Sequence, residues 1–329
     1  MKKIINKPET LVVEMCEGMV MAHGDLLQFN KDSKVIARKN LNKDKVTLIC
    51  GGGSGHEPAH AGFVGLGMLD AAVCGDVFAS PSTIQVYKAI QQTASNKGTL
   101  LIVKNYSGDC MNFDAAAEMS EEDDDYQVAR VYVNDDIAVK DSLYTVGRRG
   151  VAGTIFVQKL AGAAAEQGMG LNEVKAVAEK AIANVRSIGF ALTSCTVPAK
   201  GSPTFELGDL EMEYGVGIHG EPGIAREAVC SADELAQRMV DQLLADLPQS
   251  GEVAVMINGL GGTPLQELYL LNRSVQLALK DKGVLVYRTF VGNYMTAIDM
   301  AGASVTLLGL DDALKVLLDA PVQTVAFKG

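Results

Sequence analysis

The sequence is poor in positive charge and in long apolar runs, and each shortage excludes a class of protein. Lysine and arginine number 29 against 40 aspartates and glutamates, which gives a formal charge of −11. Nucleic acids are bound by clustered Lys and Arg, so this balance argues against such a partner, although a small anion could still bind locally. No apolar run approaches the roughly 18 residues that span a bilayer, and the amino-terminal apolar stretch is too short for a secretory signal. We expect a soluble, cytoplasmic protein without a membrane partner.

Paired cysteines are also missing. None of the six cysteines forms a C-x-x-C pair, and no Cys/His cluster has zinc-ligand spacing. Cys50 and Cys74 end apolar runs, where a free thiol behaves as a small hydrophobic group. We therefore expect reduced, mostly buried thiols of the cytosolic kind, and no metal site.

The chain has no recognisable nucleotide-phosphate loop. A Walker A loop needs Lys followed by Ser or Thr after its last glycine, but His56 and Glu57 follow the glycines of 51–55. A dinucleotide fingerprint needs a third glycine, at the place where His56 stands. A Rossmann-type dehydrogenase is thereby disfavoured.

The remaining composition predicts two α/β domains. With 329 residues, 48% hydrophobic and 21% charged, the chain is long enough for about two domains with real cores. Strand-like apolar runs alternate with helical patterns, which favours α/β domains with mainly parallel or mixed sheets flanked by helices. We place the boundary near residue 185, giving domains 1–185 and 186–329. The expected strands are 46–50, 100–103, 128–133, 253–257, 284–290 and 305–308, and the expected helices are 154–166, 172–185 and 232–247.

Two of the four histidines lie in glycine-rich segments, where a side chain has room to meet a ligand. The first segment, 51–58, contains four glycines in five residues and then His56, directly after an expected strand. Glycine lets the backbone approach a ligand closely, and open α/β sheets bind ligands at the carboxyl ends of strands. The second segment, 214–223, places His219 among glycines, where a neutral imidazole is a competent nucleophile toward a carbonyl.

Further polar groups follow other expected strands. Lys104 and Asp109 come after the run 100–103, and a carboxylate there could take a proton from a substrate hydroxyl. In isolation an Asp after Ser-Gly is more often a turn or cap residue. The pair Arg148-Arg149 could bind an anion or a partner, but a solvated or salt-bridged surface pair is the favoured interpretation.

Taken together, these segments resemble the dihydroxyacetone-binding subunit of dihydroxyacetone kinases (the DhaK type). The matching stretches run in family order over almost the whole chain. They are Gly-Gly-Gly-Ser-Gly-His-Glu-Pro-Ala-His-Ala-Gly at 51–62, Ala-Ser-Pro-Ser at 79–82, Lys-Asn-Tyr-Ser-Gly-Asp at 104–109, Gly-Arg-Arg-Gly-Val-Ala-Gly-Thr at 147–154, Tyr-Gly-Val-Gly-Ile-His-Gly-Glu-Pro-Gly at 214–223 and Gly-Asn-Tyr-Met-Thr at 292–296.

The resemblance implies a covalent way of holding the substrate. In the family, the histidine matching His219 attacks the ketone carbon to form a hemiaminal, which selects ketones over glycerol. The residue matching Asp109 takes the proton of the hydroxyl that will attack phosphorus, and His56 matches an acid or base that hydrogen-bonds the ketone. Further substrate contacts are implied for Gly53, Ser54, Gly55, Ser80 and Lys104.

The resemblance also implies partners. No cofactor is expected on this chain. ADP or ATP with Mg²⁺ is expected on a separate nucleotide-binding kinase subunit, recharged by a phosphoenolpyruvate phosphotransferase system, because the chain ends without an all-helical nucleotide domain. A homodimer is implied as well. Two alternatives stay open: a dihydroxyacetone-sensing co-activator without kinase activity, and a kinase subunit for another ketose such as erythrulose.

Overall fold

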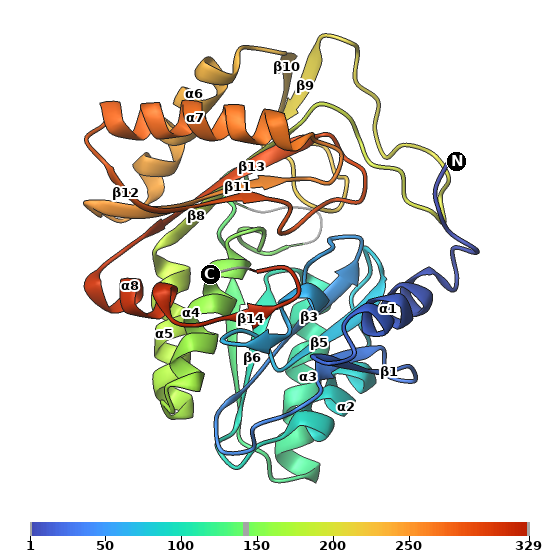
Figure 1. The fold of residues 1–329 in the computed structure, drawn as a ribbon. Coiled ribbons are helices and arrows are strands. Elements are labelled where there is room, and N and C mark those ends of the chain that lie inside the picture. Colours follow the sequence, from blue (N-terminus) through green and yellow to red (C-terminus); the bar gives the residue numbers. More distant parts are fainter. Residues whose placement is uncertain (1, 141–144, 328–329) are drawn as a thin grey trace.

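Two six-stranded mixed sheets, each flanked by helices, build the protein (Figure 1). The computed structural model describes residues 2–140 and 145–327. The predicted α/β class is therefore confirmed. In the first sheet the strand order is β1-β2-β5-β3-β6-β7, and in the second it is β10-β9-β8-β13-β11-β12.

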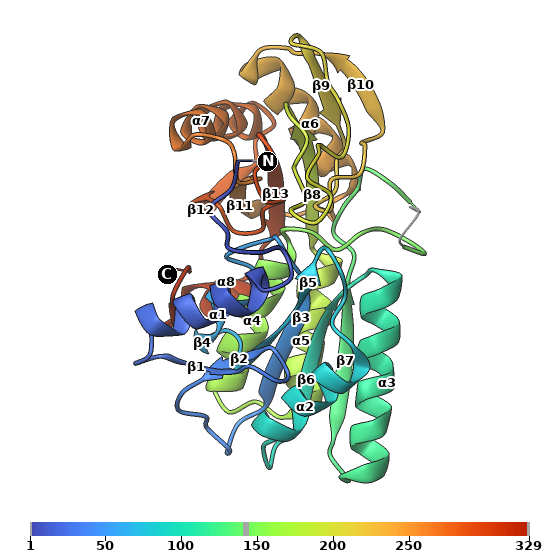
Figure 2. The ribbon, with the colours of Figure 1, turned by 90° about the vertical axis from the view of Figure 1, so that its right-hand side faces the viewer.

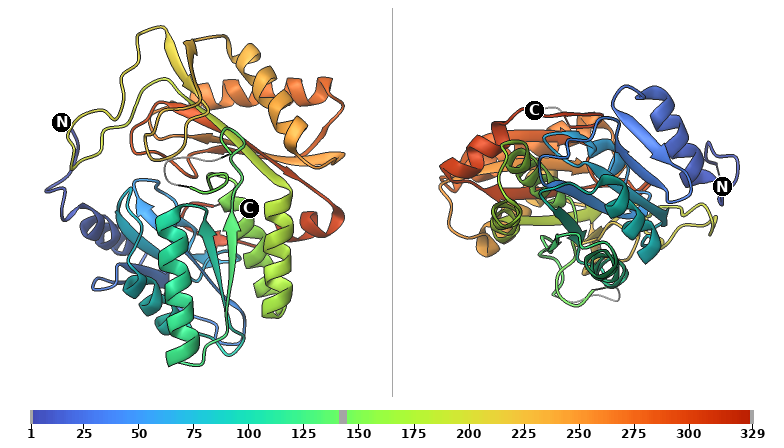
Figure 3. Two further views of the ribbon diagram at one scale, coloured as in Figure 1. Left: turned by 180° about the vertical axis from the view of Figure 1, so that it is seen from behind. Right: turned by 90° about the horizontal axis from the view of Figure 1, so that it is seen from below.

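Four neighbouring strands of the first sheet, β5, β3, β6 and β7, run parallel to one another. Its carboxyl edge therefore gathers the loops that follow these strands. Helices α2 and α3 cover one face, and α4 and α5 cover the other; Figure 3 shows α3 and α5 beside β7. The elements are α1 (Leu11–Ala22), β1 (Leu27–Asn30), β2 (Val35–Arg38), β3 (Thr47–Ser54), η1 (Ala61–Phe63), β4 (Gly65–Leu66), β5 (Ala71–Val77), α2 (Thr83–Thr93), β6 (Thr99–Lys104), α3 (Ser107–Asp123), β7 (Val128–Val133), α4 (Thr154–Glu166) and α5 (Leu171–Ala183).

The second sheet stands over the carboxyl edge of the first (Figure 2). Helices α6 and α7 pack on its outer face. Its inner face contributes residues such as Met256 and Phe290 to the core that also contains α4. Its elements are β8 (Val185–Ala191), β9 (Glu211–Tyr214), β10 (Ala225–Ala228), α6 (Ala232–Asp246), β11 (Glu252–Gly259), α7 (Leu265–Asp281), β12 (Leu285–Gly292), β13 (Gly302–Gly309), α8 (Asp312–Asp319) and β14 (Gln323–Thr324).

Helix α4 lies between the two sheets. All residues from Thr154 to Ala165 are buried, and most of them are apolar, as expected for a helix enclosed in a core. Its buried Lys159 donates to the Leu317 carbonyl oxygen at 2.7 Å, and burial lowers the pKa of Lys159 to about 8.

The carboxyl-terminal segment returns to the first half of the molecule. Strand β14 pairs with β4, and α8 packs beside α4. The boundary at residue 185 stays a prediction. It falls where β8, the first strand of the second sheet, begins at Val185.

Most of the predicted elements are confirmed, with two differences. Helix α4 has the predicted bounds, and α6 carries the Ser231–Glu234 capping box that the Ser-x-x-Glu spacing suggests. Helix α5 ends at Ala183 and Val185 starts a strand, because a β-branched residue favours the sheet. The segment after Lys104 is a helix from Ser107 instead of a loop. All six cysteines are free thiols, and no helix among the described residues is long and apolar enough to cross a membrane.

Candidate active site

A cavity of about 350 Å³ lies where the carboxyl edge of the first sheet meets the loop between β9 and β10 of the second. The first sheet contributes the ends of β3 and β5 and the first turn of α3, and the second contributes His219. The lining residues are Gly53, Phe78, Ser80, Tyr106, Ser107, Gly108, Asp109 and His219. Ligands of open α/β sheets bind at this kind of edge.

His56 and His219, 163 positions apart in the chain, contact each other at this edge. Their Nε2 atoms are 3.2 Å apart, and Nδ1 of His56 lies 2.8 Å from the Thr296 carbonyl oxygen. A carbonyl oxygen only accepts, so Nδ1 of neutral His56 carries the proton and its Nε2 has a lone pair. The contact between the two rings then requires His219 Nε2–H to donate to His56.

Both imidazoles are held neutral by their surroundings. Burial, followed by the positive charges of Lys104 and Arg149, lowers the pKa of His219 to about 3. Burial also lowers the pKa of His56 well below its ordinary value, with added contributions from His219 and Lys104. A neutral imidazole is the nucleophilic form, so the pair is ready for attack on an electrophile at neutral pH.

Aromatic rings fix the orientation of the histidines. Phe78 stacks on His56, with ring centroids 5.1 Å apart, and meets His219 edge-on at 5.4 Å. Tyr106 also meets His219 edge-on, at 4.5 Å. Phe78 has a φ of 57°, a left-handed conformation that is unfavourable for a bulky residue and is typical of functional sites.

Lys104 and Asp109 form a buried pair, and Asp109 lines the cavity. The Lys104 ammonium donates to the Gly51 carbonyl oxygen at 2.9 Å and lies 3.4 Å from Oδ2 of Asp109. Oδ1 of Asp109 is buried without a hydrogen-bond partner among the described residues. A buried carboxylate oxygen in a cavity wall can accept a hydrogen bond, or a proton, from a bound hydroxyl.

Glycines of the first segment allow the backbone to approach these groups. A Cβ on Gly52 would lie 2.2 Å from the Lys104 nitrogen, and one on Gly53 would lie 2.7 Å from the Ala79 backbone nitrogen. Gly52 also has a φ of 145°, which only glycine adopts readily. The strand β3 extends through Ser54, so these glycines belong to the strand end.

Not every predicted contact residue lies at this cavity. Gly53, Ser80, Asp109 and His219 line it, and His56 and Lys104 stand directly behind the lining. Ser54 donates to the Gly75 carbonyl oxygen at 2.8 Å, and it lines a separate apolar cavity together with Gly55. The glycine segment therefore presents residues to two different cavities.

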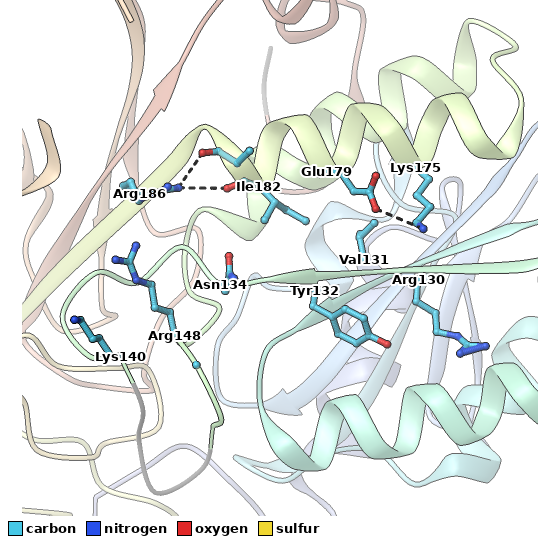
Figure 4. Close-up of a pocket in the computed structure, with 12 residues that line it drawn as sticks. Arg130, Val131, Tyr132, Asn134, Lys140, Arg148, Lys175, Glu179, Ile182 and Arg186 are labelled. Atoms are coloured by element: carbon cyan, nitrogen blue, oxygen red, sulfur yellow. Dashed lines mark hydrogen bonds and ion pairs between the residues drawn. The ribbon is translucent and has the colours of Figure 1, made fainter. Parts of the chain in front are cut away.

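A larger open groove runs along β7 and α5 (Figure 4), and neither His56 nor His219 lines it. It is rich in cations, but acidic neighbours pair with them. Arg148 and Arg186 bind the same carboxylate, that of Asp246, and Arg130 binds Glu121 at 3.0 Å. The groove contains none of the candidate catalytic residues, so we place the chemistry at the smaller cavity.

Several residues of the site had no role assigned from the sequence. Tyr106 lies inside the motif at 104–109, and Phe78 directly precedes the motif at 79–82. The motifs therefore point to this part of the chain, but they do not reveal that these two rings contact the histidines. Thr296 acts through its carbonyl oxygen, which no side-chain pattern reveals. Arg149 was expected at the surface, but it is only 1% exposed, so that expectation is wrong for this half of the pair.

Comparisons with known proteins confirm the resemblance. Residues 17–326 match the Dak1 domain family. A relative from Listeria innocua, the dihydroxyacetone-binding subunit DhaK of PTS-dependent dihydroxyacetone kinase 1, is 50% identical over 330 residues, which cover 99% of this chain and 100% of the relative. The crystal structure of the C. freundii dihydroxyacetone kinase has 39% identity and a TM-score of 0.92, over 99% of this chain and 60% of that chain. The dihydroxyacetone kinase operon co-activator Dha-DhaQ has 34% identity and a TM-score of 0.90, over 95% of this chain and 97% of that chain.

Proposed function

The chain belongs to the Dak1 domain family, and from that premise we propose that it is the dihydroxyacetone-binding subunit of a split dihydroxyacetone kinase. The observation that carries the proposal is the pair of neutral histidines at a cavity that is also lined by Asp109, whose Oδ1 has no hydrogen-bond partner among the described residues. A nucleophile and a base face one small chamber, which suits a substrate with both a ketone and a hydroxyl group.

His219 binds the ketone as a hemiaminal. As its Nε2 proton moves to Nε2 of His56, a ring nitrogen of His219 bonds to the ketone carbon. The π electrons of the carbonyl shift to its oxygen, and His56 returns the proton to that oxygen. The 3.2 Å separation of the two Nε2 atoms supports this transfer. Glycerol offers no electrophilic carbon and is excluded.

Asp109 then acts on the anchored substrate. Its Oδ1, which has no hydrogen-bond partner among the described residues, takes the proton of the terminal hydroxyl. That hydroxyl oxygen bonds to the terminal phosphorus of the donor nucleotide on the partner, and the bond from this phosphorus to the rest of the nucleotide, which leaves, breaks. Covalent anchoring fixes the direction of the hydroxyl, and positioning is most of what phosphoryl transfer asks of a protein. The Lys104 ammonium, held by the Gly51 carbonyl oxygen, stabilises the negative charge of Asp109.

The phosphoryl donor comes from a partner. We propose that a separate nucleotide-binding subunit carries ADP or ATP with Mg²⁺ and is recharged by a phosphoenolpyruvate phosphotransferase system, in line with the PTS-dependent relative. The proposal includes a homodimer and a cytoplasmic location, where six free thiols stay reduced.

A reconstituted transfer assay tests the proposal. The chain is mixed with the nucleotide-binding subunit of the Listeria system and the phosphotransferase proteins, and formation of dihydroxyacetone phosphate is followed. Turnover that requires this chain supports the kinase role. Binding of dihydroxyacetone without turnover would instead support a co-activator, a possibility that the similarity to Dha-DhaQ keeps open.

A different ketose is the second alternative. The cavity of about 350 Å³ has room for more than a three-carbon ketone, so erythrulose is a reasonable competitor. In the same assay, a higher kcat/KM for erythrulose than for dihydroxyacetone would reassign the substrate and leave the mechanism intact.

A further inference from the structure

Arg149 lies buried between the two halves of the protein and binds three acceptors. Its Nε donates to Asp136 at 2.7 Å, its Nη1 to Glu221 at 3.2 Å and its Nη2 to the Gly215 carbonyl oxygen at 2.9 Å. Asp136 and Arg149 belong to the segment between β7 and α4, whereas the other two acceptors belong to the loop that carries His219. The guanidinium therefore joins the first half of the chain to the histidine loop of the second.

Glu221 carries this connection to the nucleophile. One of its oxygens accepts from Arg149, and the other accepts the backbone N–H of His219 at 2.9 Å. Arg149 is thus two hydrogen bonds away from the His219 backbone. No other described residue is recorded as a partner of the Glu221 carboxylate.

The loop is folded tightly over this ion pair. A Cβ on Gly217 would lie 2.0 Å from Oε1 of Glu221 and 2.8 Å from Nη1 of Arg149. Only glycine leaves room for the carboxylate and the guanidinium at that point, so the spacing of Gly217, His219 and Glu221 in the sequence is explained by one packed unit.

We infer that Arg149 is a positioning residue, which through Glu221 holds the His219 loop at the distance from His56 that ketone capture requires. The inference rests on the proposed function, because it concerns the same histidine. Of the two arginines in the Gly-Arg-Arg-Gly motif, Arg148 lines the open groove and Arg149 does not. The inference gives Arg149 a role of its own.

Lysine cannot replace this guanidinium. The three acceptors come from Asp136, Glu221 and the Gly215 backbone, and a planar fork reaches them from one side chain. An ammonium is a compact point charge on a flexible stem. Arg149→Lys keeps the buried charge balance, but it releases at least one of the links to the loop.

The expected effect falls on capture and not on transfer. A displacement of about 1 Å at a reacting group costs roughly 100-fold in rate, and the partial loosening in Arg149→Lys should weaken ketone capture about tenfold. Once the hemiaminal has formed, Asp109 and the donor act as before. The variant should therefore raise KM for dihydroxyacetone about tenfold and change kcat less than about twofold.

Arg148→Lys is the matched control. Arg148 is the adjacent residue, but it is partly exposed and pairs with Asp246 away from the cavity. The Arg148→Lys variant should have a KM for dihydroxyacetone within about twofold of that of the unaltered protein. A merely structural role of Arg149 would lower the fraction of active protein, and hence kcat, at an unchanged KM. An unchanged KM in Arg149→Lys would overturn the inference.

Variants of Glu221 give a second test if Arg149→Lys folds poorly. Glu221→Gln keeps an oxygen that can accept the His219 N–H, whereas Glu221→Ala removes it. We expect KM to rise more in the alanine variant than in the glutamine variant. Equal KM values, both unchanged from the unaltered protein, would reject the inference. If the unaltered protein itself neither captures the ketone nor supports turnover, the proposed function fails, and the positioning role fails with it.

Discussion

Substitution of Gly53 by alanine tests how closely the glycine segment approaches the cavity. The added Cβ would lie 2.7 Å from the Ala79 backbone nitrogen and 2.8 Å from the Phe78 Cα. Both neighbours are backbone atoms, so neither can rotate away as a side chain would. Ordinary contacts of a Cβ begin near 3.4 Å, so the strand end or the segment after β5 has to shift by roughly 0.7 Å.

The cost of that shift follows from the position of Phe78. This ring packs against both histidines, so a moved Phe78 changes their separation. Because a misplacement of about 1 Å costs roughly 100-fold, we expect kcat/KM for dihydroxyacetone to fall about 10- to 100-fold. This loss corresponds to about 1.4–2.7 kcal/mol of transition-state stabilisation. The overlap itself should lower the free energy of unfolding by about 1–3 kcal/mol.

The assay is steady-state turnover with the partner subunit, alongside denaturant unfolding. Gly18→Ala is a suitable control, because a Cβ at Gly18 in α1 meets no atom within 4 Å. That change should leave turnover unaltered and should stabilise the helix by up to about 1 kcal/mol. If Gly53→Ala retained kcat/KM within about twofold, the close approach of this backbone to the site would not matter for function, and the reasoning would be refuted.

Three further predictions concern single carboxylates and histidines. Asp109→Asn removes the base and keeps the shape, so turnover should fall about 100- to 10,000-fold while covalent capture of dihydroxyacetone persists; normal turnover would eliminate the base role. Asp70→Asn removes the carboxylate that lies 2.6 Å from the buried Lys45 ammonium, and leaves that ammonium only the more distant carboxylate of Glu166, 3.9 Å away. Chemical denaturation should show a loss of about 3–5 kcal/mol, and a loss below about 1 kcal/mol would contradict the buried pair. The pKa of His219 is about 3 in the folded protein and near 6.5 in the unfolded chain. Between pH 6.5 and pH 3 the unfolded chain therefore binds more protons than the folded protein, so the free energy of unfolding falls as the pH drops below 6.5. His219→Asn should reduce this loss of unfolding free energy by about 1.4 kcal/mol per pH unit between about pH 6 and 4. If the free energy of unfolding varied with pH equally steeply in the variant and the unaltered protein, His219 would not be buried in its neutral form.

The glycine-rich segments could be recognised from the sequence because each follows a buried strand. The carboxyl ends of parallel strands share one edge, which is why Lys104 and the glycines 51–53 lie together although the sequence analysis treated them separately. An Asp after Ser-Gly was expected more often in a turn or at a cap, whereas Asp109 lies in the first turn of α3. The polar stretch after Tyr106 lacks a strong apolar periodicity, which explains why the start of this helix was missed.

The contact of His56 with His219 could not be derived from spacing alone. It depends on how the second sheet is seated on the first through the buried helix α4, and no local pattern encodes that packing. The two adjacent arginines illustrate the same limit. Residues 148 and 149 have identical side chains and similar neighbours in sequence, yet one is partly exposed and the other is buried by contacts from a loop more than 60 positions away.

Covalent capture of the ketone is the central claim, and a crystal soaked in dihydroxyacetone tests it most directly. We predict continuous electron density from a ring nitrogen of His219 to the ketone carbon, with the terminal hydroxyl beside Oδ1 of Asp109. The same soak of His219→Ala should show no covalent bond. An empty cavity in the unaltered protein, or a ketone bound there without a bond to His219, would contradict the account.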